Sequence, residues 1–163
     1  MMNPKSIRRT AIAAVLACSA CLASVACAAG PDAGHSMIEA KDLKWADVPS
    51  LPAGAKIAVI EGPMNEAVPF TVRLRFPANY RIPAHVHPAA ERVTVLSGVF
   101  YMGLGDKLDA AKAMPLGVGD VMIMVPNTPH FALTKEETVV QLHGTGPWGI
   151  TYINAADDPR KKP

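Results

Sequence analysis

Short apolar stretches, separated by Gly, Pro, Asn and Asp, recur along the chain from Pro52 onward. Between Phe70 and Phe76 apolar and polar residues alternate strictly, which predicts a strand with one buried and one solvated face. Stretches of this length with turn residues between them are typical of an all-β domain. The predicted strands are residues 56–61, 69–76, 84–87, 92–96, 99–104, 121–125, 130–134, 138–143 and 150–154.

So many short strands within one domain's length predict a β-sandwich or β-barrel. Only residues 108–114 have a helical pattern, and it is weak. Residues 157–163 are polar and terminal, so we expect them to fray. Residues 29–52, before the first predicted strand, are polar and interrupted by prolines, which predicts an N-terminal arm. The predicted barrel then covers residues 53–155, and a tail covers residues 156–163.

The first 28 residues have the organisation of a secretory signal peptide. Basic residues come first, an apolar run covers residues 11–25, and Ala26-Cys27-Ala28 fits a small-residue cleavage site. We therefore expect a periplasmic or secreted protein that begins near Ala29. Lipidation at Cys27 is the less favoured alternative, because Ser24 stands where such signals usually have leucine. The pair Arg8-Arg9 is also found in twin-arginine signals, although its flanking residues fit that signal poorly.

Removal of this leader changes the composition of the chain. All three cysteines, Cys18, Cys21 and Cys27, lie within it, so the mature protein has neither disulfides nor thiolate metal ligands. The formal net charge of the whole chain is +2, and loss of the leader's three basic residues turns it to −1. A near-neutral chain without a basic block gives no support to nucleic-acid binding or to an electrostatic membrane partner, so we expect no nucleic-acid partner.

Two histidines and a glutamate form the strongest chemical pattern. His85 and His87 are two apart in a predicted strand and therefore share a face, and the turn that follows can return Glu91 beside them. Two imidazoles and one carboxylate suit Fe, Mn, Ni, Cu or Zn. The sequence therefore predicts a site for one divalent metal ion.

A further ligand must come from another strand. His130 follows a turn after an apolar strand and is the favoured third histidine, whereas His35 in the arm is a poor choice. His143 and Gln141 share a face of the predicted strand 138–143. We expect these two to be catalytic pocket groups that bind substrate or move a proton, with a purely structural histidine as the alternative for His143.

These residues resemble the cupin superfamily. Its first motif is a glycine, five residues, His-x-His, three or four residues, Glu, six residues and Gly. His85, His87, Glu91 and Gly98 match this spacing, while Asn79 stands at the position of the first glycine. The resemblance implies a double-stranded β-helix, or jelly-roll barrel, with a His3Glu metal site inside it.

The second cupin motif is matched less closely. Gly119-Asp120 and the turn 126–130 resemble it, but the turn glycine is missing and the turn is one residue short, which puts the role of His130 in question. Cupins often pair through exchanged N-terminal strands, so the resemblance also implies a homodimer.

The superfamily does not imply one reaction. Its members include dioxygenases that cleave acetylacetone or quercetin, sugar isomerases, storage proteins and sensors. Our leading hypothesis is a non-haem metal-dependent dioxygenase acting on a small enolisable, diketone or phenolic substrate. The alternatives are a zinc-binding sensor and a metal-free ligand-binding protein, neither of them catalytic.

Overall fold

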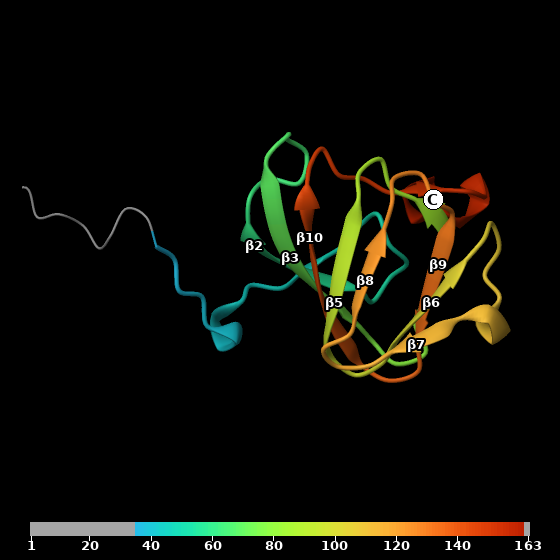
Figure 1. Cartoon of the computed structure of the whole chain (residues 1–163), viewed down its shortest axis with the longest axis horizontal. Coiled ribbons are helices and arrows are strands. Elements are labelled where there is room, and N and C mark those ends of the chain that lie inside the picture. Colours follow the sequence, from blue (N-terminus) through green and yellow to red (C-terminus); the bar gives the residue numbers. More distant parts are fainter. Residues whose placement is uncertain (1–34, 162–163) are drawn as a thin grey trace, which may run out of the picture. The chain divides into compact units, whose positions relative to one another are not determined.

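Two antiparallel β-sheets face each other and enclose an apolar interior (Figure 1). The computed structural model describes residues 35–161, so the leader predicted over residues 1–28 lies outside the described part. The first sheet has the strand order β1 (Ala46–Asp47), β2 (Lys56–Glu61), β3 (Pro69–Phe76), β10 (Thr138–Thr145), β5 (Glu91–Ser97), β8 (Val121–Met124). The second sheet has the order β11 (Thr151–Tyr152), β4 (Arg81–Val86), β9 (His130–Thr134), β6 (Phe100–Leu104), β7 (Met114–Leu116). The predicted all-β double-stranded β-helix is confirmed.

The inner faces of both sheets supply the core. The alternation in β3 buries Phe70, Val72 and Phe76, each at most 1 % exposed, against the opposite sheet. Phe76 stacks on Phe100 of β6 with ring centroids 5.5 Å apart. Burying an aromatic or branched side chain of this kind stabilises a fold by about 1.5–3 kcal/mol. These contacts hold the two sheets together beside the cavity described below.

Each of the nine predicted strands has a counterpart, with shifts of a few residues at the ends. The prediction missed β1 and β7, because strands of two and three residues are too short for alternation to be recognised. The helix predicted over residues 108–114 was wrong: the segment forms one 3-10 turn, Ala110–Lys112, and then enters β7. In the part of the chain that the structure describes, no helix is long and apolar enough to cross a membrane.

The C-terminal segment is more ordered than its polar composition predicts. Arg160 donates from Nε to Oδ1 of Asp158 at 2.7 Å and from Nη2 to Oδ2 at 2.9 Å. The same Nη2 donates to the carbonyl oxygen of Ile150 at 3.1 Å. These hydrogen bonds connect the short turns Ala155–Asp157 and Pro159–Lys161 to the residue before β11. The fraying that we expected was therefore wrong as far as Lys161.

Turns at three positions depend on a left-handed backbone. Asn79 and Asn127 have φ values of 58° and 60°, and Gly98 has a φ of 71°. Asparagine tolerates this conformation better than other residues with a side chain. Asn79 therefore does the conformational work of the first motif glycine, and Asn127 supplies the left-handed residue in the turn before His130, where the second motif lacks its glycine.

Replacement of Gly98 by alanine should destabilise the protein by about 2 kcal/mol or more. The φ of residue 98, +71°, is strained for a residue with a side chain, and a Cβ there would lie 2.5 Å from the carbonyl oxygen of Glu137. Gly117→Ala is the matched control, because its nearest neighbour would be an Asp120 oxygen at 3.8 Å, and its effect should stay within about 1 kcal/mol. Urea unfolding measures both, and equal stabilities of the two variants would contradict this steric explanation.

Candidate metal centre

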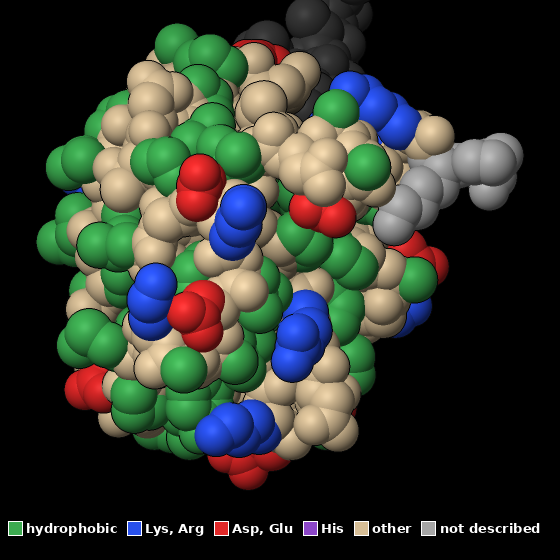
Figure 2. Space-filling model, turned by 90° about the vertical axis from the view of Figure 1, so that its right-hand side faces the viewer, with side chains coloured by type: hydrophobic (Ala, Val, Ile, Leu, Met, Phe, Trp, Pro, Cys, Tyr) green, Lys and Arg blue, Asp and Glu red, His purple; other side chains and the backbone are tan. Residues whose placement is uncertain are grey.

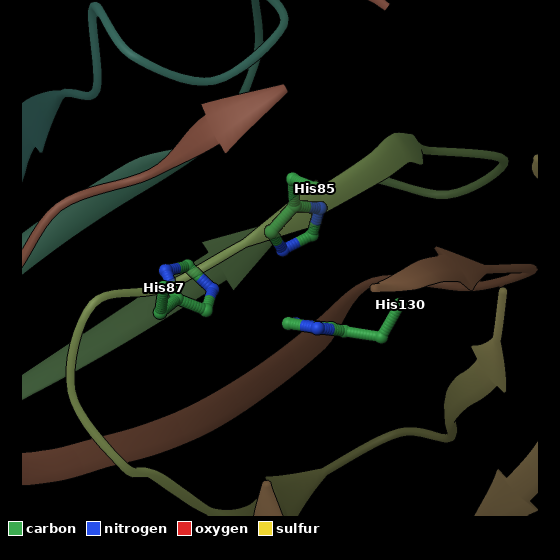
Figure 3. A group of neighbouring side chains, drawn as sticks. All are labelled: His85, His87 and His130. Atoms are coloured by element: carbon green, nitrogen blue, oxygen red, sulfur yellow. The ribbon is translucent and has the colours of Figure 1, made fainter. Parts of the chain in front are cut away.

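The side chains of three histidines from β4, the residue after it and β9 point toward one another (Figure 3). His85 of β4 lies directly opposite His130 of β9 in the antiparallel register. His87 follows β4 by one residue and, two residues after His85, points to the same side. The structure thus brings the three histidines together, as the sequence predicts.

The rings are close enough to share one ion. The ring centroids of His85 and His130 are 4.2 Å apart, those of His85 and His87 4.8 Å, and those of His87 and His130 5.1 Å. One ring nitrogen from each histidine lies within 4.8 Å of the other two. This group could therefore hold a metal ion.

Glu91 reaches the histidines from the opposite sheet. The chain crosses between the sheets over residues 88–90, and Glu91 is the first residue of β5. Its Oε2 lies 3.2 Å from Nε2 of His130, and its Oε1 lies 3.7 Å from Nε2 of His87. The carboxylate and the imidazoles of the predicted ligand set therefore meet in one place.

Backbone carbonyls fix the orientation of all three rings. A carbonyl oxygen only accepts, so the Nδ1 that contacts it carries the proton and Nε2 is left with a lone pair. Nδ1 of His85 donates to Pro83 at 2.6 Å, Nδ1 of His87 donates to Gly149 at 2.7 Å, and Nδ1 of His130 donates to Thr128 at 2.8 Å.

Several atoms of the group are buried without a hydrogen-bond partner in the described structure. They are Nε2 of His87, Nε2 of His130 and Oε2 of Glu91. Leaving such atoms unpaired costs about 1–3 kcal/mol each, and more for a charged group. A divalent cation would satisfy all of them at once, so the residues fit a metal ion by their chemistry as well as by their spacing.

Burial keeps the imidazoles in the form that binds metals. Removal from water lowers the pKa of His85 to about 2, with a further contribution from the neighbouring His130 and His87. Burial also lowers the pKa of His87, although the negative charge of Glu91 opposes that effect. Both rings are therefore neutral at physiological pH, and a neutral imidazole is the ligand form.

The group lies in the wall of a cavity of about 390 Å³ inside the barrel. Trp148 also lines this cavity, and its ring stacks on His87 with centroids 4.0 Å apart and an interplanar angle of 19°. The surface face in Figure 2 has charges of both signs among apolar side chains and no visible histidine. A ligand must therefore enter the cavity to meet the group, since His85, His87 and His130 are at most 6 % exposed.

The structure does not bring Gln141 and His143 into this cavity. Their neighbours Val140 and Leu142 are buried and line it, so residues 141 and 143 point to the other face of β10. There, Oε1 of Gln141 accepts a hydrogen bond from Nε of Arg73 at 3.3 Å. The pocket role expected from the sequence is corrected by this strand parity, and the alternation of apolar and polar residues over residues 140–143 is the sequence signal for it.

Sequence reasoning missed Trp148 and Gly149, which hold His87 from the loop after β10. No residue type or spacing links this loop to a histidine about 60 residues earlier in the chain. Only the pairing of β11 with β4, which places Tyr152 opposite His85, brings the loop to the site.

The sequence model of the ChrR cupin-like domain matches residues 33–147, which is more than half of the chain. None of the curated proteins matches the chain in sequence.

Solved structures share the fold at low sequence identity. The polyketide cyclase RemF from Streptomyces resistomycificus superposes with a TM-score of 0.63 and 16 % identity, over 78 % of this chain and 91 % of that protein. A candidate acetylacetone dioxygenase from Methylibium petroleiphilum has a TM-score of 0.58 and 15 % identity, over 80 % of this chain and 88 % of its own. An RmlC-like cupin from Shewanella frigidimarina has a TM-score of 0.55 and 15 % identity, over 68 % and 90 %.

We expect the metal-free protein to lose stability as the pH falls below 6.5, the ordinary pKa of imidazole. The unfolded chain then binds protons that the folded chain excludes from His85 and His87. The free energy of unfolding should therefore fall by up to about 1.4 kcal/mol per pH unit for each histidine.

Urea unfolding in a chelator between about pH 7 and pH 5 measures this slope. The double variant His85→Gln, His87→Gln should have a shallower slope than the wild type, because it removes the two groups whose pKa values burial lowers. A double variant with the wild-type slope would show that these two histidines do not cause the acid sensitivity.

Proposed function

The chain belongs to the ChrR cupin-like family of the cupin superfamily, and from its site we propose that it is a metal-dependent, dioxygenase-like enzyme. The proposed substrates are small molecules that present oxygen donors, such as enolisable diketones or phenols. The observation that carries the proposal is the buried convergence of His85, His87, His130 and Glu91 with unpaired Nε2 and Oε2 atoms.

These four residues would hold one divalent ion by three imidazole nitrogens and a carboxylate oxygen. When bound there, such an ion supplies Lewis acidity and, for a redox-active metal, electron transfer between an oxygen-donor substrate and dioxygen. The divalent ions that suit this set of donors are Fe, Mn, Ni, Cu and Zn.

The protein's own residues would prepare the site for such a reaction. The Nδ1 hydrogen bonds keep the three rings in place without a ligand, so little reorganisation is needed on binding. Apolar side chains such as Val93 and Leu142 wall the cavity and exclude water from the substrate. Glu91 contributes one negative charge, which partly neutralises a divalent ion.

The likeness to the candidate acetylacetone dioxygenase supports the choice of reaction class. That likeness is one of fold, and the polyketide cyclase RemF shares the same fold to a similar degree. The reaction is therefore proposed from the donor set and the apolar cavity, with the fold as a compatible frame.

A zinc-binding, non-catalytic sensor is the second candidate. Three histidines and a glutamate provide four donors, the number that zinc takes in structural sites, and a closed zinc site leaves little room for chemistry. The metal-free ligand carrier is less well supported, because it would leave the buried Nε2 and Oε2 atoms unpaired.

Export and assembly remain predictions from the sequence. We propose that residues 1–28 direct the protein to the periplasm or beyond, and that the mature chain forms a homodimer.

Purification from the periplasm without added metal, followed by elemental mass spectrometry, tests the proposed function. We expect near-stoichiometric Fe, Mn, Ni or Cu, together with oxygen uptake on addition of a diketone. Stoichiometric zinc without oxygen uptake would favour the sensor instead, and absence of any metal would contradict both metal-dependent candidates.

Replacement of single histidines should separate ligands from neighbours. His130→Ala should weaken metal binding by about 100-fold or more, because it removes a buried donor. His143→Ala is the matched control, and it should change the affinity less than about threefold since that residue lies on the other face of β10. Competition with a fluorescent chelator measures both affinities, and the reverse order would refute the ligand set.

A further inference from the structure

The cavity beside the candidate metal centre has mostly apolar walls. Away from the histidines it is lined from both sheets by side chains such as Ile57, Leu74, Val93, Phe100 and Leu142. Its volume of about 390 Å³ is at the small end of the roughly 300–1,000 Å³ range of ligand pockets. These dimensions suit a ligand of one or two rings.

Charged side chains are scarce around this cavity. Among the described residues that line it, only Glu91 and Arg160 carry a formal charge at neutral pH. Glu91 is committed to the histidine group, at 3.2 Å from Nε2 of His130, and its negative charge would repel an anion. Apart from an ion held by the histidine group, Arg160 is thus the single cation among the described lining residues that could attract a ligand carboxylate.

Arg160 is already paired. Its Nε and Nη2 donate to the two carboxylate oxygens of Asp158 at 2.7 and 2.9 Å, and Nη2 also donates to the carbonyl of Ile150. The hydrogen bonds from Arg160 lower the pKa of Asp158, so that carboxylate is charged at neutral pH and cancels the guanidinium. A ligand anion would have to compete with a bidentate intramolecular partner.

We propose that the cavity selects uncharged, largely apolar ligands, and that the Asp158–Arg160 pair excludes ligands with a carboxylate. The inference deepens the proposed function and rests on it, because it assumes that a ligand enters this cavity to reach the metal centre. A carboxylate placed among the apolar walls, away from the histidine group, loses its hydration and finds no unpaired cation among the described lining residues, so it binds more weakly than a neutral ligand of the same shape. The substrate class is therefore a neutral enol, diketone or phenol with an apolar substituent.

The test compares two ligands that share one metal-binding group. Para-isopropylbenzoylacetone and benzoylacetone para-carboxylate have the same diketone and a branched substituent of three heavy atoms at the far end of the ring, so they differ chiefly in the charge of that substituent. Calorimetric titration of the protein with its native metal should give at least about tenfold weaker binding for the carboxylate.

A variant tests the role of the ion pair. Asp158→Asn frees the Arg160 guanidinium, so it should strengthen binding of the carboxylate several-fold and leave the neutral diketone unchanged. Asp157→Asn is the matched control, because it removes the same charge from the same turn but has no hydrogen bond to Arg160 in the described structure. If Asp158→Asn does not fold, the wild-type comparison still decides the ligand class.

Equal or tighter wild-type binding of the carboxylate would overturn the inference, and so would failure of both ligands to bind. Measuring the metal content and oxygen uptake of the same preparation distinguishes failure of this inference from failure of the proposed function. A metal-containing, oxygen-consuming protein that binds both ligands equally would overturn the ligand class alone. Preference for the neutral ligand without oxygen uptake would support the ligand class and remove the dioxygenase.

Discussion

The burial of three imidazoles and a carboxylate beside an apolar cavity dominates the energetics of this site. Each ring donates from Nδ1 to a backbone carbonyl, so each has a fixed orientation and a lone pair on Nε2. The two unpaired Nε2 atoms and Oε2 of Glu91 then carry an unfavourable desolvation free energy. A bound cation would offset this free energy by coordinating the unpaired atoms. The instability of these atoms in the metal-free protein is therefore an argument for metal binding.

The sandwich architecture supplies the parts of this arrangement from separate places. His85 and His130 meet because β4 and β9 pair in register, and Glu91 joins them because the chain crosses to the other sheet before β5 begins. The loop after β10 closes the third side with Trp148 against His87. A shift of one residue in the register of any of these strands would turn a metal-ligating side chain to the outer face of its sheet.

Charge placement distinguishes the cavity from its rim. Among the residues that the structure describes, the cavity is lined by apolar side chains, one carboxylate beside the histidines and one cation, Arg160, which is neutralised by Asp158. Such a cavity strengthens electrostatic effects at the metal centre and gives no favourable position to a second anion. The candidate metal centre and the Asp158–Arg160 pair are therefore built from different elements, β4, β5 and β9 for the first and the C-terminal turns for the second.

Local sequence patterns were enough to predict the all-β class, most of the strands and the shared face of His85 and His87, because these follow from alternation and from the two-residue repeat of a strand. It also singled out Glu91 and His130 by their spacing and by the turns before them. Strand pairing showed that Glu91 reaches the histidines from the opposite sheet. It also showed that Gln141 and His143 point away from the cavity. Trp148 and Gly149 contact His87 from a loop that no local pattern connects to it. The physical reason is that strand pairing and register join residues far apart in the chain, and no local pattern encodes which distant strands will meet.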